Sequence, residues 1–274
     1  MGSWYRPRPT GEEGEMAGLL ADRAALVVGV ANKRSISWAI ADALAKQGAR
    51  VALTYQGERV ERDVRKLAGT LGEDTPVLAL VVTDGDQIAA ATSVAADALG
   101  GLDILVHGVA FATAEDLAGR FTDTSREGWS TALEISAYTH VELARTAAPY
   151  MNESGHGSIM TLSYLGGVRA TPGYNVMGAA KAALESSVRY LAWDLGEAAI
   201  RVNAISAGPV RTLAARGIPG FSTMADSIAE RAPLRRGIDG ADVAGAAVFL
   251  ASDLSRGVTG TTLYVDAGYH AMGL

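Results

Sequence analysis

Two tyrosines and a lysine, Tyr164, Tyr174 and Lys181, lie close together in the sequence. Tyr174 and Lys181 are seven residues apart, close to two helical turns, so on a helix their side chains share one face and can enter one pocket. A nearby ammonium favours phenolate and lowers the pKa of a tyrosine, which lets the phenol protonate or hydrogen-bond a developing oxyanion near neutral pH. An amphipathic core helix with one lysine at its rim has the same spacing and is the alternative interpretation.

The elements that must position these groups follow an alternating pattern. From Ala24 onward, short runs of branched apolar residues alternate with longer segments of helical period. This predicts an α/β fold: a single-domain, Rossmann-like, doubly wound parallel sheet of about seven strands with helices on both faces. Ligands bind at the carboxyl ends of the strands in such folds. The predicted strands are Ala25–Val28, Arg50–Thr54, Pro76–Val82, Ile104–His107, Ser158–Leu162, Arg201–Ile205 and Leu263–Val265.

Two segments depart from this alternation. Residues 1–18 contain no apolar stretch of the kind a signal peptide needs, and we expect them to form a flexible N-terminal arm before a domain at 19–274. The segment from Val210 to Arg236 mixes glycine and proline with large apolar residues. We predict that this segment, about 210–236, is a lid or substrate-binding loop, and a helical hairpin packed on the core is the alternative.

Composition excludes several classes of function. The net charge of −6 and the pI near 5.3 argue against nonspecific binding to nucleic acid or to an anionic membrane. No apolar run approaches the roughly 18 residues of a membrane helix. The absence of cysteine excludes disulfides and thiolate chemistry and is compatible with the reducing cytoplasm, where we expect the protein. The four histidines lack metal-ligand spacing, so we expect no metal.

The first predicted strand is followed by a turn that suits a dinucleotide. Gly29 lets the backbone approach a pyrophosphate, and Ser35 is placed to cap a helix whose N-terminal amides attract phosphate. Only the first glycine of the G-x-G-x-x-G pattern is present, so a capped strand-to-helix turn without a ligand is the alternative.

The end of the second strand indicates which dinucleotide is used. The acidic residue expected there to hold a ribose 2′-hydroxyl is absent, and Gln56 can accept that hydrogen bond without charge. A 2′-phosphate would need two or more cations, and only Arg59 is near. We therefore predict NADH as the cofactor, with NADPH possible if Arg59 reaches the site.

The position of the tyrosine carries a chemical meaning. In common short-chain reductases the acidic tyrosine lies four residues before the lysine, where this chain has Met177, and a serine lies about thirteen residues before that tyrosine, where it has Tyr164. Tyr174 is therefore about one turn, ~5.4 Å, further from the lysine. Reducing a conjugated enoyl thioester puts hydride on the β-carbon and negative charge on the thioester oxygen, ~2.5 Å away. The shifted tyrosine suits that separation better than it suits a ketone.

These residues resemble the enoyl-acyl-carrier-protein reductases of bacterial fatty-acid synthesis, a divergent branch of the short-chain dehydrogenase/reductase family. The likeness extends from about Leu19 to Gly268. Its motifs are GVANKRSI at 29–36, TYQ at 54–56, VHGVAFA at 106–112, LSYLG at 162–166, YNVMG at 174–178 with Lys181, and RVNAISAGPVRTL at 201–213.

The resemblance implies a role for each matched position. It makes Tyr174 the group that hydrogen-bonds the thioester oxygen, Lys181 the holder of the cofactor ribose, and Tyr164 a positioning or proton-relay residue. Other matched cofactor positions are Gly29, Ser35, Ile36, Gln56, Val109, Val210, Arg211, Thr212, Leu213 and Ala214. At two further cofactor positions, Val81 and Val82 replace the usual Asp-Val pair beside the adenine. Ala112, Ile218 and Phe221 match substrate contacts.

Several assignments stay open at the level of sequence. Five apolar residues suit a pocket for an acyl chain, or are ordinary core: Phe111, Met177, Ile218, Phe221 and Met224. His107 is better explained as a hydrogen-bonding residue at a strand end than as a catalyst. Five arginines between 211 and 236 suit an acidic acyl carrier protein, or form a solvated face.

Three functions compete. The leading hypothesis is NADH-dependent reduction of trans-2-enoyl-acyl-carrier-protein thioesters in fatty-acid elongation. The resemblance also implies that the enzyme is a homotetramer. A short-chain ketoacyl or other carbonyl reductase of the same fold is the second. A dinucleotide-binding regulator without turnover is the third.

Overall fold

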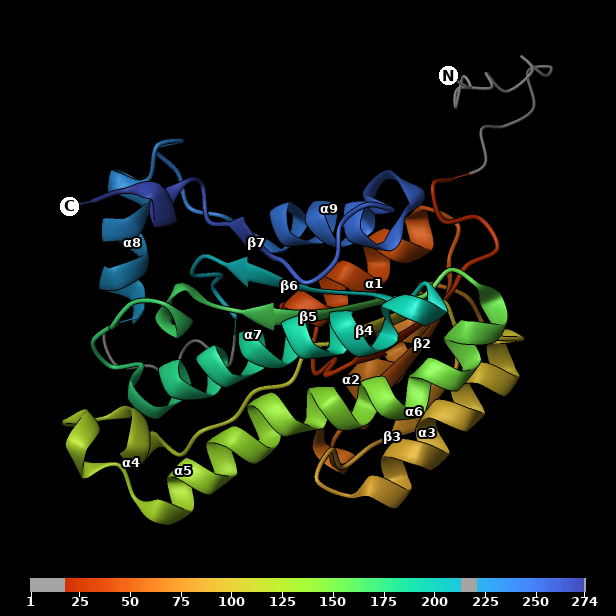
Figure 1. Ribbon diagram of the computed structural model, residues 1–274, viewed down its shortest axis with the longest axis horizontal. Coiled ribbons are helices and arrows are strands. Elements are labelled where there is room, and N and C mark those ends of the chain that lie inside the picture. The colour runs from red at the N-terminus through yellow and green to blue at the C-terminus, as the bar shows by residue number, and fades with distance from the viewer. Residues whose placement is uncertain (1–17, 213–220, 274) are drawn as a thin grey trace.

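The computed structural model describes residues 18–212 and 221–273. In this part of the chain seven strands form one parallel sheet in the order β3-β2-β1-β4-β5-β6-β7 (Figure 1). The strands are β1 (Ala24–Val28), β2 (Arg50–Tyr55), β3 (Val77–Ala79), β4 (Ile104–His107), β5 (Ser158–Ser163), β6 (Arg201–Ala207) and β7 (Thr262–Val265). The winding reverses between β1 and β4, so a crevice is expected beyond the carboxyl ends of these two strands.

Helices cover both faces of the sheet. One core cluster joins the sheet to α3, α6 and α7, and a second joins it to α1, α2 and α9. The α-helices are α1 (Ile36–Lys46), α2 (Glu58–Ala68), α3 (Gly85–Leu99), α4 (Ala114–Leu117), α5 (Arg126–Leu133), α6 (Thr139–Ser154), α7 (Asn175–Leu195), α8 (Phe221–Arg231) and α9 (Gly240–Ala251). The 3-10 helices among the described residues are η1 (Phe121–Asp123), η3 (Leu165–Gly167), η4 (Gly196–Ala198), η6 (Asp253–Ser255) and η7 (Tyr269–Ala271). The element η2 (Glu134–Tyr138) is a π-helix.

The predicted fold class and all seven predicted strands are confirmed. β1 and β4 are buried along their length, because helices cover both of their faces, and this is why Ala24–Val28 and Ile104–Val106 read as continuous apolar runs. The third strand is shorter than the predicted Pro76–Val82. Pairing with β2 stops at Ala79, although Leu80 and Val82 continue into the core as loop residues.

The segment predicted as a lid contains a helix. α8 occupies Phe221–Arg231, where Phe221, Met224, Ala225 and Ile228 repeat at helical spacing. Leu213, Ala214 and Ile218 lie outside the described residues, as does the predicted N-terminal arm apart from Gly18. In the parts of the chain that the structure covers, no helix combines the length and the apolar character that crossing a membrane requires.

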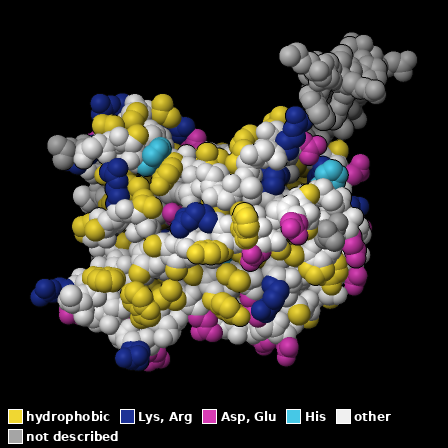
Figure 2. Space-filling view, viewed as in Figure 1, with side chains coloured by type: hydrophobic (Ala, Val, Ile, Leu, Met, Phe, Trp, Pro, Cys, Tyr) yellow, Lys and Arg dark blue, Asp and Glu magenta, His cyan; other side chains and the backbone are white. Residues whose placement is uncertain are grey.

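Helix α7 has a buried face and an exposed one. Val188, Leu191 and Ala192 belong to the core of this chain. The large hydrophobic side chains that α7 exposes are Tyr190 and Trp193, with 71% and 83% of their surface accessible. Hydrophobic side chains gather along the path of α7 in the space-filling view (Figure 2).

Candidate active site

The two tyrosines stack where β5 meets α7. Tyr164 follows the last residue of β5, and Tyr174 immediately precedes α7. Their ring centroids lie 4.8 Å apart at 64°, the edge-to-face arrangement that aromatic pairs favour. A Cβ at Gly166 would lie 2.9 Å from Cε1 of Tyr174, so a glycine is needed for the loop to pass this close to the ring. The structure therefore brings the two predicted tyrosines together.

Burial decides the ionisation of both phenols. It raises the pKa of Tyr174 above its ordinary value of 10.0, and the nearby Tyr164 raises it further. Burial, with a smaller contribution from Tyr269, raises the pKa of Tyr164 to about 12. The prediction that a neighbouring ammonium lowers the pKa of Tyr174 is wrong for this chain, because desolvation dominates. Both tyrosines are protonated hydrogen-bond donors at neutral pH.

Lys181 lies in the second turn of α7 with 5% of its surface exposed. Its Nζ donates a hydrogen bond to the carbonyl of Leu162 over 2.7 Å. Burial lowers the pKa of Lys181 from 10.5 to about 8, and the negative charge of Glu185 opposes that shift. The lysine is thus a buried cation at the carboxyl end of β5, and it does not point into solvent.

An apolar wall adjoins the tyrosines. Met177 is buried in a small cluster with Ala112 and Tyr174 packed against it, which brings together two of the predicted substrate contacts. Phe111 is 49% exposed and lies outside that cluster. Its backbone is fixed instead, because Ser136 in η2 accepts from the Phe111 amide and donates to the Phe111 carbonyl.

Helix α8 lies over the tyrosine pair. The hydroxyl of Tyr164 donates to the sulfur of Met224 in α8 over 3.7 Å. Phe221, a predicted substrate contact, is the first residue of the same helix and is partly buried. This contact connects the segment predicted to bind substrate with the residues predicted to do chemistry.

The turn after β1 has the geometry that a dinucleotide needs. Gly29 has φ +94°, a conformation that favours glycine, and a Cβ there would collide with the carbonyl of Gly108. Val109 adjoins the same point, since that Cβ would lie 3.2 Å from its Cγ2. Gly29 and Val109 are thereby brought together at the crevice between β1 and β4.

Ser35 occupies the N-cap position of α1, but it does not cap the helix with its side chain. Its Oγ donates to the carbonyl of Asn32 and accepts from the amides of Ala31 and Asn32. The prediction of a side-chain cap is therefore wrong. Because this hydroxyl folds the preceding loop, it leaves the first amides of α1, including that of Ile36, to other acceptors such as a phosphate.

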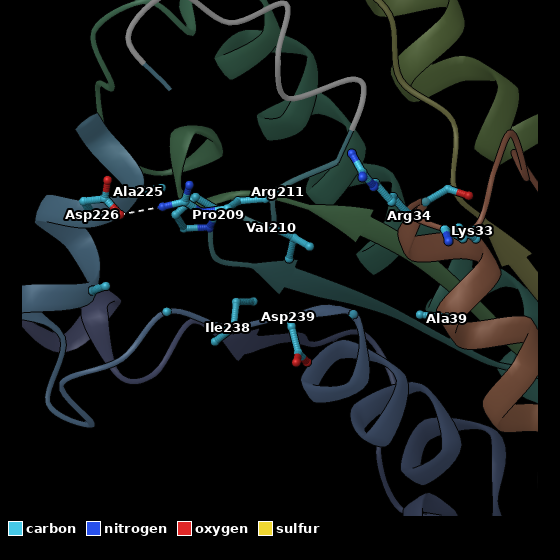
Figure 3. A pocket seen from close by; sticks show the side chains of 14 residues that line it. Lys33, Arg34, Ala39, Pro209, Val210, Arg211, Ala225, Asp226, Ile238 and Asp239 are labelled. Carbon is cyan, nitrogen blue, oxygen red and sulfur yellow. Dashed lines mark hydrogen bonds and ion pairs between the residues drawn. The ribbon is translucent and has the colours of Figure 1, made fainter. Parts of the chain in front are cut away.

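A pocket of about 410 Å³ extends from this turn toward α8. Ser35 and Val210 line it, and so do Lys33, Arg34 and Arg211 (Figure 3). Arg211 is paired with Asp226 of α8, and Thr212 bonds back to the carbonyl of Val210 through its amide. Four of the predicted cofactor positions, Ser35, Val210, Arg211 and Thr212, thus lie in or beside one concave site.

The outer end of the crevice lies at β2 and β3. Gln56 is exposed directly after β2. Val81 is 37% exposed, whereas Val82 is 3% exposed and packs in the core. Of this pair only Val81 has a side chain available to an adenine. Together, the glycine turn, the free helix start and the crevice fit a dinucleotide.

His107 has the structural role expected of it. It is fully buried at the end of β4, where its two ring nitrogens bond to Thr161 and Thr139 at 2.8 and 2.9 Å. Burial, with the positive charge of Lys181 and the neighbouring His140, lowers its pKa well below 6.5. Among the described residues, no group of three or more His, Asp or Glu could hold a metal ion.

Comparison with known proteins agrees with this geometry. Residues 29–270 match the family model described as enoyl-(acyl carrier protein) reductase. The chain is 50% identical over 256 residues to the NADH-dependent enoyl-acyl-carrier-protein reductase of Bacillus cereus, covering 93% of this chain and 99% of that relative. This chain belongs to the enoyl-acyl-carrier-protein reductase family.

Solved structures of this reductase family have the same fold. The Bacillus cereus enzyme, solved with NADP+ and indole naphthyridinone, superposes with a TM-score of 0.91 at 50% identity and covers 94% of this chain and 100% of that one. The Anaplasma phagocytophilum reductase, solved with NAD, gives 0.90 at 46% identity, with 94% and 98% covered.

Sequence reasoning missed Glu185 and Asn175 in this candidate site, and it took Met224 only as an apolar pocket or core residue. Glu185 accepts a hydrogen bond from Ser163 beneath the tyrosines. Met224 receives the hydroxyl of Tyr164. Asn175, at φ +37°, donates to the carbonyls of Leu117, Ala118 and Gly119, and so fixes the residue beside Tyr174. Only Glu185 left a signal, since it lies one helical turn after Lys181 on the buried face of α7.

Proposed function

We propose that this chain reduces trans-2-enoyl-acyl-carrier-protein thioesters to saturated acyl thioesters, with NADH as the reductant, in fatty-acid elongation. The observation that carries this proposal is the edge-to-face pair of protonated tyrosines at the junction of β5 and α7, where the cation Lys181 is buried. The seven-residue spacing of Tyr174 and Lys181 suits charge that develops away from the carbon receiving hydride. Family membership supports the same reaction.

The proposed mechanism assigns one task to each group. Bound NADH supplies hydride to the β-carbon of the enoyl thioester. Tyr174 donates a hydrogen bond to the thioester oxygen and stabilises the enolate charge as it develops. Its raised pKa keeps the proton on the phenol, so Tyr174 acts as a donor and not as a phenolate. A proton from solvent then adds to the α-carbon, and the products are the saturated thioester and NAD+.

Lys181 and Tyr164 have supporting roles in this mechanism. Lys181 holds the nicotinamide ribose, and its positive charge stabilises the nearby oxyanion. Tyr164 packs edge-to-face with the Tyr174 ring and restricts the position of the phenol. Ala112, Met177 and Phe221 supply apolar surface for the acyl chain, with Phe111 at its exposed end and Ile218 beyond the described residues.

We propose that Gly29, Ser35, Ile36, Gln56, Val109 and the segment from 210 to 214 bind the cofactor, with Val81 beside the adenine. Gln56 in place of an acid and a single arginine, Arg59, favour NADH. The Bacillus cereus relative is named as an NADH-dependent enzyme, which supports NADH here, although its structure was solved with NADP+. Initial rates with each cofactor test it, and kcat/KM is expected to be higher with NADH.

We propose an acyl carrier protein as the partner, docking at the arginines of 211–236. Arg211 and Arg236 are paired with Asp226 and Asp242 in the structure, so they are partly neutralised. Arg231 and Arg235 are exposed and remain available to an acidic partner, while Arg216 lies outside the described residues. The positive charge available for docking is therefore smaller than the sequence suggested.

We also propose a homotetramer in the cytoplasm. The exposed aromatic residues Tyr190 and Trp193 on α7 support contact with another subunit, because large exposed aromatic side chains mark interaction surfaces. The absence of cysteine suits a reducing compartment. In solution the mass is expected to be four times that of one chain, and a monomeric mass would contradict the proposal.

Reduction of a carbonyl is the competing reaction, and one assay separates the two. Wild-type enzyme is given crotonyl and acetoacetyl thioesters side by side, and oxidation of NADH is followed. We expect turnover of the enoyl substrate and little of the ketone. Preference for the ketone would establish a carbonyl reductase, and NADH binding without turnover of either substrate would establish a regulator.

A further inference from the structure

A pair of hydrogen bonds joins α7 to the end of β5. Lys181 donates to the carbonyl of Leu162 over 2.7 Å. Ser163 donates its hydroxyl to Oε1 of Glu185 over 2.5 Å. Lys181 and Glu185 are four residues apart, so they share one face of the helix and hold two consecutive residues of the strand. We call these four residues the α7–β5 clamp.

The carboxylate of Glu185 is buried inside the molecule. Only 6% of its surface is exposed, and a Cβ at Gly167 would lie 3.2 Å from its Oε1. The turn η3 therefore packs directly on this side chain. Burying a carboxylate weakens the folded state unless hydrogen bonds or opposite charge compensate. A residue needed only for packing would be apolar here, so the charge itself calls for an explanation.

The titratable groups near Lys181 show which of them the charge of Glu185 affects. Burial lowers the pKa of His107 on β4 and of His140 on α6, and the positive charge of Lys181 lowers both further, so the two histidines are neutral. Tyr174, at the start of α7, is a protonated phenol. Among the described residues that act on the Lys181 ammonium, the carboxylate of Glu185 is the one that favours its charged form.

The clamp also determines the position of both tyrosines. Tyr164 directly follows Ser163, and Tyr174 begins the helix that carries Lys181 and Glu185. Any slip of α7 along β5 would move the two rings relative to each other. The same two hydrogen bonds thus set the position of Tyr164 relative to Tyr174 and Lys181, whose own separation is set by α7.

We propose that Glu185 is a positioning residue that keeps the Lys181 ammonium charged inside the molecule and, through Ser163, fixes the end of β5 that carries Tyr164. The effect of Glu185 on turnover rests on the proposed function. The effect of Glu185 on the charge of Lys181 is independent of the proposed function, because it involves only these two side chains.

The ionisation of Lys181 can be measured without any substrate. Lysine occurs at only four positions, 33, 46, 66 and 181. Full-length protein with lysine isotope-labelled at its ε carbon gives few NMR signals, and the Lys181→Arg variant assigns the one from Lys181. In the wild type this signal is expected to titrate near pH 8.

Glu185→Gln is the decisive variant. The amide oxygen can still accept from Ser163, but the negative charge is gone. We expect the Lys181 signal to titrate about one pH unit lower than in the wild type. An unchanged midpoint would overturn the proposal. If Glu185→Gln does not fold, Glu185→Asp takes its place, because its shorter side chain withdraws the charge and should lower the midpoint by a smaller amount. An unchanged midpoint there has the same meaning.

Ser163→Ala is the matched control for the hydrogen bond. It removes the link to β5 and leaves the carboxylate, so the Lys181 midpoint should stay near the wild-type value. If Ser163→Ala lowers the Lys181 midpoint as much as Glu185→Gln does, the hydrogen bond and not the charge determines the pKa of Lys181. That result would contradict the proposal.

The activity of the same variants tests the consequence. For Glu185→Gln, the loss of kcat at high pH should begin about one pH unit lower, with the KM for NADH nearly unchanged at pH 6, where Lys181 is charged in both proteins. If the wild type reduces no enoyl thioester, the proposed function fails, while the titration still decides the role of Glu185.

Discussion

Replacing Lys181 by methionine should abolish activity and stabilise the protein. The ammonium has a pKa of about 8 in the folded chain against an ordinary 10.5, so its burial weakens the folded state by about 3 kcal/mol at neutral pH. Methionine has a similar length without the charge. It also loses the hydrogen bond to Leu162, worth about 1 kcal/mol. The expected net gain is about 2 kcal/mol, or roughly 4–8 °C in Tm.

The stability gain of Lys181→Met should decrease as the pH rises, and this direction distinguishes a buried charge from other causes. Below pH 8 Lys181 is protonated in both states, and the full penalty applies. Between pH 8 and 10.5 the unfolded chain binds a proton that the folded chain does not, so the wild type becomes more stable relative to the variant as the pH rises. The gain should therefore be largest at pH 7 and nearly absent at pH 10.

Thermal unfolding of both proteins at several pH values measures this difference. Lys46→Met is the matched control, since Lys46 is exposed and its loss should change stability by less than about 0.5 kcal/mol. A Lys181→Met variant less stable than the wild type at pH 7 would refute the reasoning, because it would make the lysine a structural residue.

Three further predictions follow from the site and its surroundings. Gly29→Ala should weaken NADH binding by at least tenfold, measured by fluorescence titration, because its φ of +94° and the Gly108 carbonyl leave no room for a Cβ; unaltered affinity would remove Gly29 from the cofactor site. Trp193→Glu should reduce the mass in solution below that of a tetramer, because a charge would be buried at the proposed contact; an intact tetramer would place the contact elsewhere. Exchanging Arg231 and Arg235 together for glutamate should raise KM about tenfold for a substrate on acyl carrier protein and leave KM for a coenzyme A thioester unchanged, and equal effects on both would argue against docking there.

The sheet could be predicted from the sequence because burial on both faces leaves a local signal. Runs such as Ala24–Val28 and Ile104–Val106 are apolar throughout, and nothing distant is needed to recognise them. The end of β3 could not be predicted this way. Leu80 and Val82 remain buried after pairing stops, so hydrophobicity continues where the hydrogen-bond ladder does not.

Some features of the candidate site could also be predicted from the sequence, and others could not. The spacing of Tyr174 and Lys181 identified the chemistry, and Gly29 identified the turn. The pKa of Tyr174 was predicted in the wrong direction, because desolvation depends on tertiary packing that spacing does not contain. The bond between Ser163 and Glu185 joins residues 22 positions apart on different elements, so no local pattern predicts it.

The central claim is that the phenol of Tyr174 donates to the oxyanion of an enoyl thioester. The most direct measurement compares Tyr174→Phe with Tyr164→Phe, using a crotonyl thioester and NADH, with cofactor affinity measured alongside. We predict that Tyr174→Phe lowers kcat about 10²–10³-fold and leaves NADH binding unchanged, as expected for the loss of one oxyanion donor, and that Tyr164→Phe lowers it less. Full turnover by Tyr174→Phe would contradict the account.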